Sequence, residues 1–72
     1  MSRTHFLREW RELRGLSLRQ VEDRSGRRIR HSSVSKIESG EQQFTETTLK
    51  ILAEVYGVEP WILLRVDPSN FK

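Results

Sequence analysis

The sequence predicts an all-α fold, a compact bundle of five short helices without a sheet. Three observations support this prediction. Apolar residues recur three, four and seven positions apart, the period of one helix face. No segment alternates polar and apolar residues with period two. Residues that favour helix ends, mainly glycine, serine, threonine and proline, interrupt the 72 residues at short intervals.

The length of the chain predicts one domain. Residues 1–72 are expected to form it, with a core at about 4–66 and a flexible tail at 67–72. The sequence has no cysteine, which excludes disulfides and thiolate metal sites, so helix packing alone must hold the fold. This composition suits a reducing, cytoplasmic setting. No apolar run approaches the roughly 20 residues that a membrane span needs, so we expect no membrane partner.

The first two helices are predicted from apolar spacing and from capping residues. Phe6, Trp10 and Leu13 lie at positions i, i+4 and i+7 of a helix that ends at about residue 15. Ser17 lies three residues before Gln20, which is the spacing of a capping box at the start of a second helix. The glycine at position 26 is expected to end that helix.

The third helix is predicted to bring Val34 and Ile37 to the core and to end at the next glycine. The sequence leaves the start of this helix open. Ser32 or Ser33 would cap the helix well, whereas Arg30 would not. Local capping preference therefore favours either serine over Arg30 as the N-cap, and the first residue of the helix stays open.

Two more helices complete the bundle. Thr45 is a good N-cap for a fourth helix, which ends at Gly57. Pro60 suits the first position of a fifth helix that runs to about Arg65. The apolar face of the fourth helix is formed by Leu49, Leu52, Ala53 and Tyr56.

The second and third helices, joined by a turn that contains glycine, have the sequence form of a helix-turn-helix. The second helix of such a unit typically enters the major groove of DNA. Residues 3–31 carry nine arginines and four acidic residues, a net charge of +5, whereas residues 32–72 carry −2. This asymmetry favours a polyanionic partner, and the alternative is a solvated helical surface that happens to use arginine.

These residues together resemble the Cro/phage-repressor type of helix-turn-helix regulator, also called the XRE-like family. The resemblance implies a lambda-repressor-like DNA-binding domain that binds double-stranded DNA with its third helix and forms homodimers on inverted-repeat operators. It also implies a bacterial or phage-encoded, nucleoid-associated regulator, most simply a repressor. The matching fragments are Trp10-Arg11, Gly15-Leu16-Ser17, Val21, Gly26, the run from Val34 to Gly40, Leu49, Ile51-Leu52-Ala53, Tyr56-Gly57-Val58 and Leu63-Leu64.

The chain departs from the family pattern at two places. Val34 follows Gly26 by eight positions, so that Arg27 and Arg28 look like a two-residue insertion in the turn. Glu22 stands where the family commonly has a small residue such as alanine. We expect Glu22 either to point outward or to pair with a nearby arginine.

The resemblance assigns base reading to the start and middle of the third helix. Lys36 is able to donate to guanine, and the hydroxyl of Ser32 is able to donate or accept. The alternatives are an exposed helix residue at Lys36, an N-cap at Ser32, and a tightly packed Ser35 beside the apolar positions. The predicted base-reading residues are Arg30, His31, Ser32, Ser33 and Lys36.

Phosphate contacts are predicted on both sides of the third helix. Arginines in the turn suit bidentate phosphate contacts, although a solvated turn or an arm in an adjacent minor groove are alternatives. The predicted phosphate-contacting residues are Ser17, Arg19, Arg27, Arg28, Ser39, Gln42 and Gln43.

Two further sets have structural roles by the same resemblance. Arg11 and Glu38 match an ion pair that locks the third helix to the first, and we prefer this role to a DNA contact. Trp61, Ile62 and Leu64 match a homodimer contact, although Trp61 is equally suited to closing the bundle under the first and fourth helices. The tail at 69–72 is expected to fray, and its Phe71 is a possible contact with a partner.

The sequence has two rival interpretations of function. The first is an antitoxin-like or protein-interaction module in which DNA binding is secondary, and the turn insertion keeps it open. The second is an enzyme, which we discount because the sequence has no catalytic triad, paired carboxylates or phosphate-binding glycine loop. No cofactor is expected, and a lone histidine without a second ligand at helical spacing predicts no metal.

Overall fold

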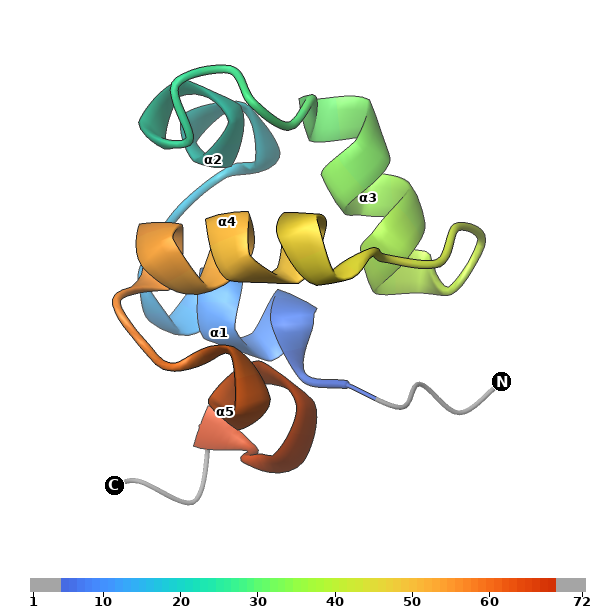
Figure 1. The fold of residues 1–72 in the computed structure, drawn as a ribbon. Helices are drawn as coiled ribbons and strands as arrows, with labels where there is room; N and C mark the ends of the chain where they lie inside the picture. Colours follow the sequence, from blue (N-terminus) through green and yellow to red (C-terminus); the bar gives the residue numbers. More distant parts are fainter. Residues whose placement is uncertain (1–4, 69–72) are drawn as a thin grey trace.

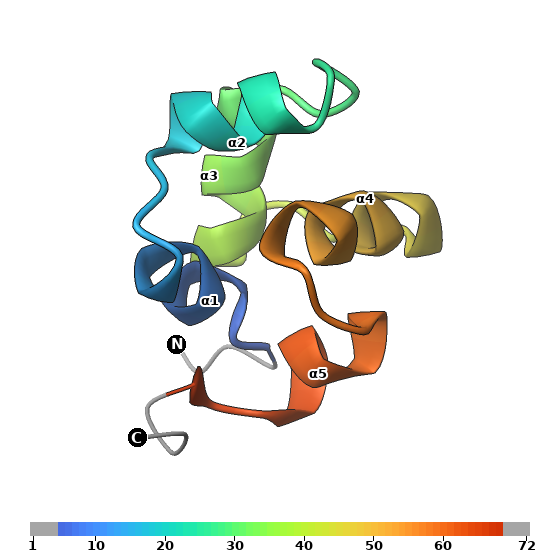
Figure 2. The same cartoon turned by 90° about the vertical axis from the view of Figure 1, so that its left-hand side faces the viewer.

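The computed structural model describes residues 5–68, and within them it contains five helices and no strand. This confirms the predicted all-α bundle. Figure 1 shows α4 across the middle of the molecule, and both views place α2 and α5 at opposite ends (Figures 1 and 2). The helices are α1 (Leu7–Leu13), α2 (Leu18–Arg24), α3 (His31–Ser39), α4 (Glu46–Tyr56) and α5 (Pro60–Arg65).

One apolar core receives side chains from all five helices. α2 packs against α3 and α4, while α5 packs against α1 and α4. The core also includes Ile29, which lies between α2 and α3 and was not expected there. The most deeply buried apolar side chains are those of Leu7, Val21, Val34, Ile37, Leu52, Tyr56 and Leu63.

The apolar face predicted for the first helix is partly wrong. Leu7 and Trp10 are buried, whereas Leu13 is 53% exposed. Phe6 is the N-cap rather than the first core position of α1, so Leu7 and Trp10 set the buried face. Leu13 is the last residue of the helix, where the chain turns through exposed residues.

Local capping signals place most helix ends where the sequence predicted them. The Ser17 hydroxyl accepts from the Gln20 amide at 3.2 Å, and the Ser17 amide donates to the Gln20 side chain at 2.8 Å. Thr45 caps α4 by accepting from the Thr48 amide at 3.1 Å. Pro60 occupies the start of α5. Each of these signals lies within three residues of the helix end that it sets.

The connection between α2 and α3, which contains the expected insertion at Arg27 and Arg28, makes a sharp reversal. Gly26 and Arg27 both adopt left-handed backbone conformations, with φ of 71° and 62°. Such a conformation is costly for a residue with a Cβ atom. Ser25 stabilises the reversal, because its hydroxyl donates to the Glu22 carbonyl at 2.7 Å and accepts from the Ile29 amide at 3.4 Å. The turn thereby returns Ile29 to the core.

The chain after α5 continues to pack on the bundle. The indole of Trp10 donates to the Val66 carbonyl at 2.9 Å, and Pro68 is buried. The buried Pro68 is the second residue of the expected tail at 67–72, and residues 69–72, with Phe71, lie outside the described residues. Among residues 5–68, no helix has the length and apolar character of a membrane span.

Candidate nucleic-acid interface

The outer face of α3 is polar, and its inner face is buried in the core. Val34 and Ile37 are buried, and Glu38 beside them is also buried. An α-helix advances about 100° per residue, so the opposite face carries the intervening positions. The exposed residues of that face are Ser32, Ser35, Lys36 and Ser39.

The structure brings some of the predicted base-reading residues together but not all of them. Ser32 and Lys36 lie on the outer face, and Arg30 is exposed immediately before it. His31 and Ser33 are only half-exposed, with Ser33 on the flank toward the core. The predicted base-reading set did not include Ser35, for which tight packing was the alternative considered.

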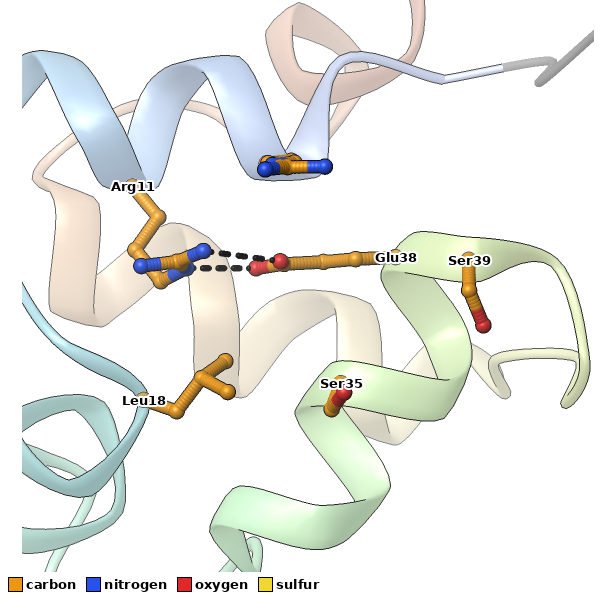
Figure 3. Close-up of a pocket in the computed structure, with 6 residues that line it drawn as sticks. Arg11, Leu18, Ser35, Glu38 and Ser39 are labelled. Carbon is orange, nitrogen blue, oxygen red and sulfur yellow. Dashed lines mark hydrogen bonds and ion pairs between the residues drawn. The ribbon is translucent and has the colours of Figure 1, made fainter.

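Ser35 is in fact exposed and lies three residues after Ser32, so the helical period alone marks its position. Figure 3 shows Ser35 and Ser39 on α3, across a small pocket from Leu18 at the start of α2. The pocket connects the outer face of α3 to the start of α2, where two of the predicted phosphate-contacting residues lie.

A buried ion pair holds the C-terminal half of α3 to α1, as predicted. Nε of Arg11 donates to Oε2 of Glu38 at 2.8 Å, and a second guanidinium nitrogen donates to Oε1 at 3.1 Å (Figure 3). Only 14% of the Arg11 side chain and 7% of the Glu38 side chain are exposed. The hydrogen bond to Glu38 raises the pKa of Arg11, against the opposing effect of burial. Arg11 also donates to the Leu16 carbonyl at 2.9 Å, which links α1 to the start of α2.

His5 makes a second attachment at the same end of α3. Its Nε2 lies 3.1 Å from the carbonyl oxygen of Ile37, and the amide of Leu7 donates to its Nδ1 at 3.5 Å. Since Nδ1 lies where it accepts and the carbonyl requires a donor, this geometry suits the tautomer with its proton on Nε2. Phe44 packs edge-on against this ring. Sequence reasoning missed this role, because a single histidine near the start of a chain carries no signal of a distant carbonyl partner.

Tyr56 lies next to the ion pair. Burial raises the pKa of its hydroxyl, and the negative charge of Glu38 adds to that effect. The hydroxyl itself has no hydrogen-bond partner within residues 5–68. The ring fills the core, but its polar atom contributes no hydrogen bond there.

The N-terminal end of α3 is held differently, and here two expectations are wrong. The N-cap is Arg30 and not Ser32 or Ser33, although Arg30 provides no side-chain cap. The cap comes from α2, because Oε1 of Glu22 accepts from the backbone amide of His31 at 2.8 Å. The start at His31 follows from this distant carboxylate and not from the local preference for serine.

Glu22 therefore neither points outward nor pairs with an arginine. The same Oε1 atom also lies 2.8 Å from Nδ1 of His31. The hydrogen bonds from the His31 amide and ring lower the pKa of Glu22 below its ordinary value, and the charge of Arg27 lowers it further. The carboxylate thus remains ionised at the positive end of the α3 dipole.

The predicted phosphate-contacting residues are all exposed, and they lie in three groups around α3. Arg28 is partly engaged: its Nε donates to the Ser25 carbonyl at 2.7 Å, and it lies 3.6 Å from Glu54 of α4. The Arg28–Glu54 pair is exposed on both sides, so it competes only weakly with another anion. The groups are Ser17 and Arg19 at the start of α2, Arg27 and Arg28 in the turn, and Ser39, Gln42 and Gln43 at and after the end of α3.

The residues predicted for a dimer contact lie on α5, away from α2 and the turn (Figures 1 and 2). Trp61 is 59% exposed, so it does not close the bundle under α1 and α4. Ile62 and Leu64 are partly buried against the core, whose innermost residue from α5 is Leu63. The alternative role for Trp61 inside the bundle is therefore wrong.

Comparison with known proteins agrees with this geometry. A family model described as helix-turn-helix matches residues 7–60, which is well over half of the chain. No curated protein and no solved structure matched the chain. Within residues 5–68, no group of three or more histidine or acidic side chains is placed to hold a metal ion. The matched region contains α1 to α4 with the paired α2 and α3, and the chain belongs to the XRE-like helix-turn-helix family of DNA-binding regulators.

Proposed function

We propose that this protein is a sequence-specific transcriptional regulator that binds an inverted-repeat operator as a homodimer and represses by covering a promoter. The observation that carries the proposal is the outer face of α3, with the exposed side chains of Ser32, Ser35 and Lys36. The helix has nine residues and is about 13.5 Å long, and the major groove, about 12 Å wide, admits an α-helix.

Charge supports the same use of this face. Glu38 is the single acidic residue of α3, and it is buried and paired with Arg11. The outer face consequently presents hydroxyls and the ammonium group of Lys36 without a carboxylate that would repel phosphates. Lys36 and Ser32 are assigned to base edges, together with Arg30, His31 and Ser33 at the start of the helix.

The three exposed groups around α3 are assigned to phosphates, which fix the position of the helix without reading sequence. Arg19 and Arg27 supply the charge at the start of α2 and in the turn, while Gln42 and Gln43 follow α3 on its other side. Homodimerisation is assigned to α5, because Trp61 is a large exposed apolar residue and Ile62 and Leu64 lie beside it. Two copies would place their recognition helices about 34 Å apart.

The proposal is tested by selecting bound duplexes from a random DNA library at near-physiological salt. Enrichment of an inverted repeat with half-sites one helical turn apart supports a dimeric reader. Enrichment of a single unrepeated site contradicts the dimer but not the reading of sequence. Lys36→Ala is expected to change the preferred bases, whereas Arg19→Ala is expected to weaken binding to all sequences and to flatten its salt dependence.

A second candidate function is a protein-interaction module. The exposed Trp61 and the extended turn favour it, because neither feature is required to place α3 in a groove. Salt dependence separates the two candidates. For a DNA reader, the logarithm of the binding constant falls linearly with the logarithm of the salt concentration, with a slope of about −0.9 for each phosphate neutralised. Binding to DNA without enrichment of any sequence would favour the second candidate.

A further inference from the structure

The contact between Glu22 and His31 does more than cap α3. Oε1 of Glu22 makes hydrogen bonds with both the backbone amide and the Nδ1 atom of His31, each at 2.8 Å. The carboxylate side chain is 25% exposed and the imidazole 41%, so the contact lies at the surface of the helix-turn-helix. It spans the two helices that form the unit.

For a neutral ring, this geometry decides which nitrogen of His31 carries the proton. An ionised carboxylate only accepts hydrogen bonds, so Nδ1 must be a donor to Glu22. A neutral imidazole with its proton on Nδ1 has a lone pair on Nε2. Within residues 5–68, Nε2 of His31 has no hydrogen-bond partner. His5 provides the opposite case, because its Nδ1 accepts and its Nε2 donates.

We infer that Glu22 is a positioning residue that makes the neutral ring of His31 present a hydrogen-bond acceptor at the start of the recognition helix. The inference rests on the proposed function. In the major groove, the bases that offer a donor to such an atom are adenine, through its N6 amino group, and cytosine, through its N4 amino group. Without Glu22 the ring is free to place its proton on Nε2, and the discrimination in favour of these two bases is lost.

The first test needs no DNA. Two-bond proton–nitrogen NMR correlations at about pH 8.5, where imidazole rings are neutral, report which ring nitrogen is protonated. We expect Nδ1 to be protonated in His31 and Nε2 in His5. Glu22→Ala is expected to shift His31 toward Nε2 protonation and to leave His5 unchanged, whereas Asp23→Asn on the same helix is expected to change neither. Protonation of Nε2 in His31 of the unaltered protein overturns the inference.

The second test separates ring orientation from capping. Glu22→Ala also removes the cap of α3, but Arg30→Ser supplies a local N-cap, since serine at that position accepts from the helix backbone. The double variant Glu22→Ala/Arg30→Ser is therefore expected to stay folded, with no carboxylate to orient the His31 ring. Its reference is the single variant Arg30→Ser, which lacks the same arginine but keeps Glu22.

Duplex selection at about pH 8.5 is then repeated with these variants. Relative to Arg30→Ser, the double variant is expected to lose preference for adenine or cytosine at one position per half-site by roughly threefold to tenfold, the range of one hydrogen bond. His31→Ala is expected to lose preference at the same position. An unchanged preference in the double variant overturns the inference while sequence-specific binding stands. Failure of the unaltered protein to enrich any sequence contradicts the proposed function, and the NMR result then decides the role of Glu22 by itself.

Discussion

The two ends of α3 are fixed by different kinds of interaction. At the C-terminal end, a buried ion pair and the carbonyl of Ile37 join the helix to α1 and to His5, and Gly40 ends it in a left-handed conformation. At the N-terminal end, a partly exposed carboxylate of α2 holds the first residue of the helix. The C-terminal end is anchored by buried groups. The N-terminal end depends on the contact with Glu22, which is partly exposed to solvent and sensitive to pH.

Because the C-terminal end of α3 is held by a buried ion pair, breaking that pair is expected to have the largest effect on stability. Glu38→Ala leaves the charge of Arg11 buried without its partner, and such changes cost about 3–5 kcal/mol. We expect a clearly lowered midpoint in urea unfolding. Glu41→Ala removes an exposed carboxylate three residues later and is the matched control, with little expected change. An unchanged midpoint for Glu38→Ala would show that the pair does not anchor the helix.

A smaller effect is expected at the glycine that ends α3. Gly40 has a φ of 87°, a conformation in which a side chain is strained, although no atom lies within 4 Å of the position of an added Cβ. Gly40→Ala should therefore cost about 1 kcal/mol through the backbone alone. Gly40→Asn should cost less, since asparagine tolerates this conformation. Equal losses for both variants, measured by thermal unfolding, would point to a steric cause instead.

The N-terminal anchor is expected to give a modest, pH-dependent effect. The pKa of Glu22 is lowered in the folded state, so its contribution is complete above the ordinary value of 4.5 and is lost as pH falls through the lowered pKa. The stability advantage of the unaltered protein over Glu22→Gln should therefore shrink in that acid range. Asp23→Asn is the control and should not reproduce this pH profile. A pH-independent difference would indicate that Glu22 acts only as a neutral acceptor.

The smallest effect is expected at Tyr56. Its hydroxyl is buried beside the ion pair without a hydrogen-bond partner in the described part of the chain. Tyr56→Phe keeps the ring in the core and removes only that polar atom, so the unfolding midpoint should stay the same or rise slightly. A loss of more than about 1 kcal/mol would show that the hydroxyl makes a hydrogen bond, for example through a bound water.

The same contrast explains which features could be predicted from the sequence. Ser17, Thr45 and Pro60 act within one turn of the helix that they start, so their positions were readable from spacing. The ion pair of Arg11 and Glu38 was implied by resemblance to a family. The start of α3 was not predictable, because its cap comes from a residue nine positions earlier, across the turn.

The candidate site shows the same division. Helical period places Ser32, Ser35 and Lys36 on one exposed face, and it would have excluded the alternative of a packed Ser35. The engagement of His31 with Glu22, and of His5 with Ile37, depends on how distant segments meet in the folded chain. Sequence patterns that describe one helix at a time contain no information about such contacts.

The central claim is that the outer face of α3 contacts the operator, and amide NMR of the protein titrated with its selected duplex tests it most directly. We predict the largest shift changes at Ser32, Ser35 and Lys36, with smaller changes at the start of α2 and small changes in α5. Changes centred on Trp61 and its neighbours, with α3 unaffected, would contradict the claim and assign binding to the opposite end of the molecule.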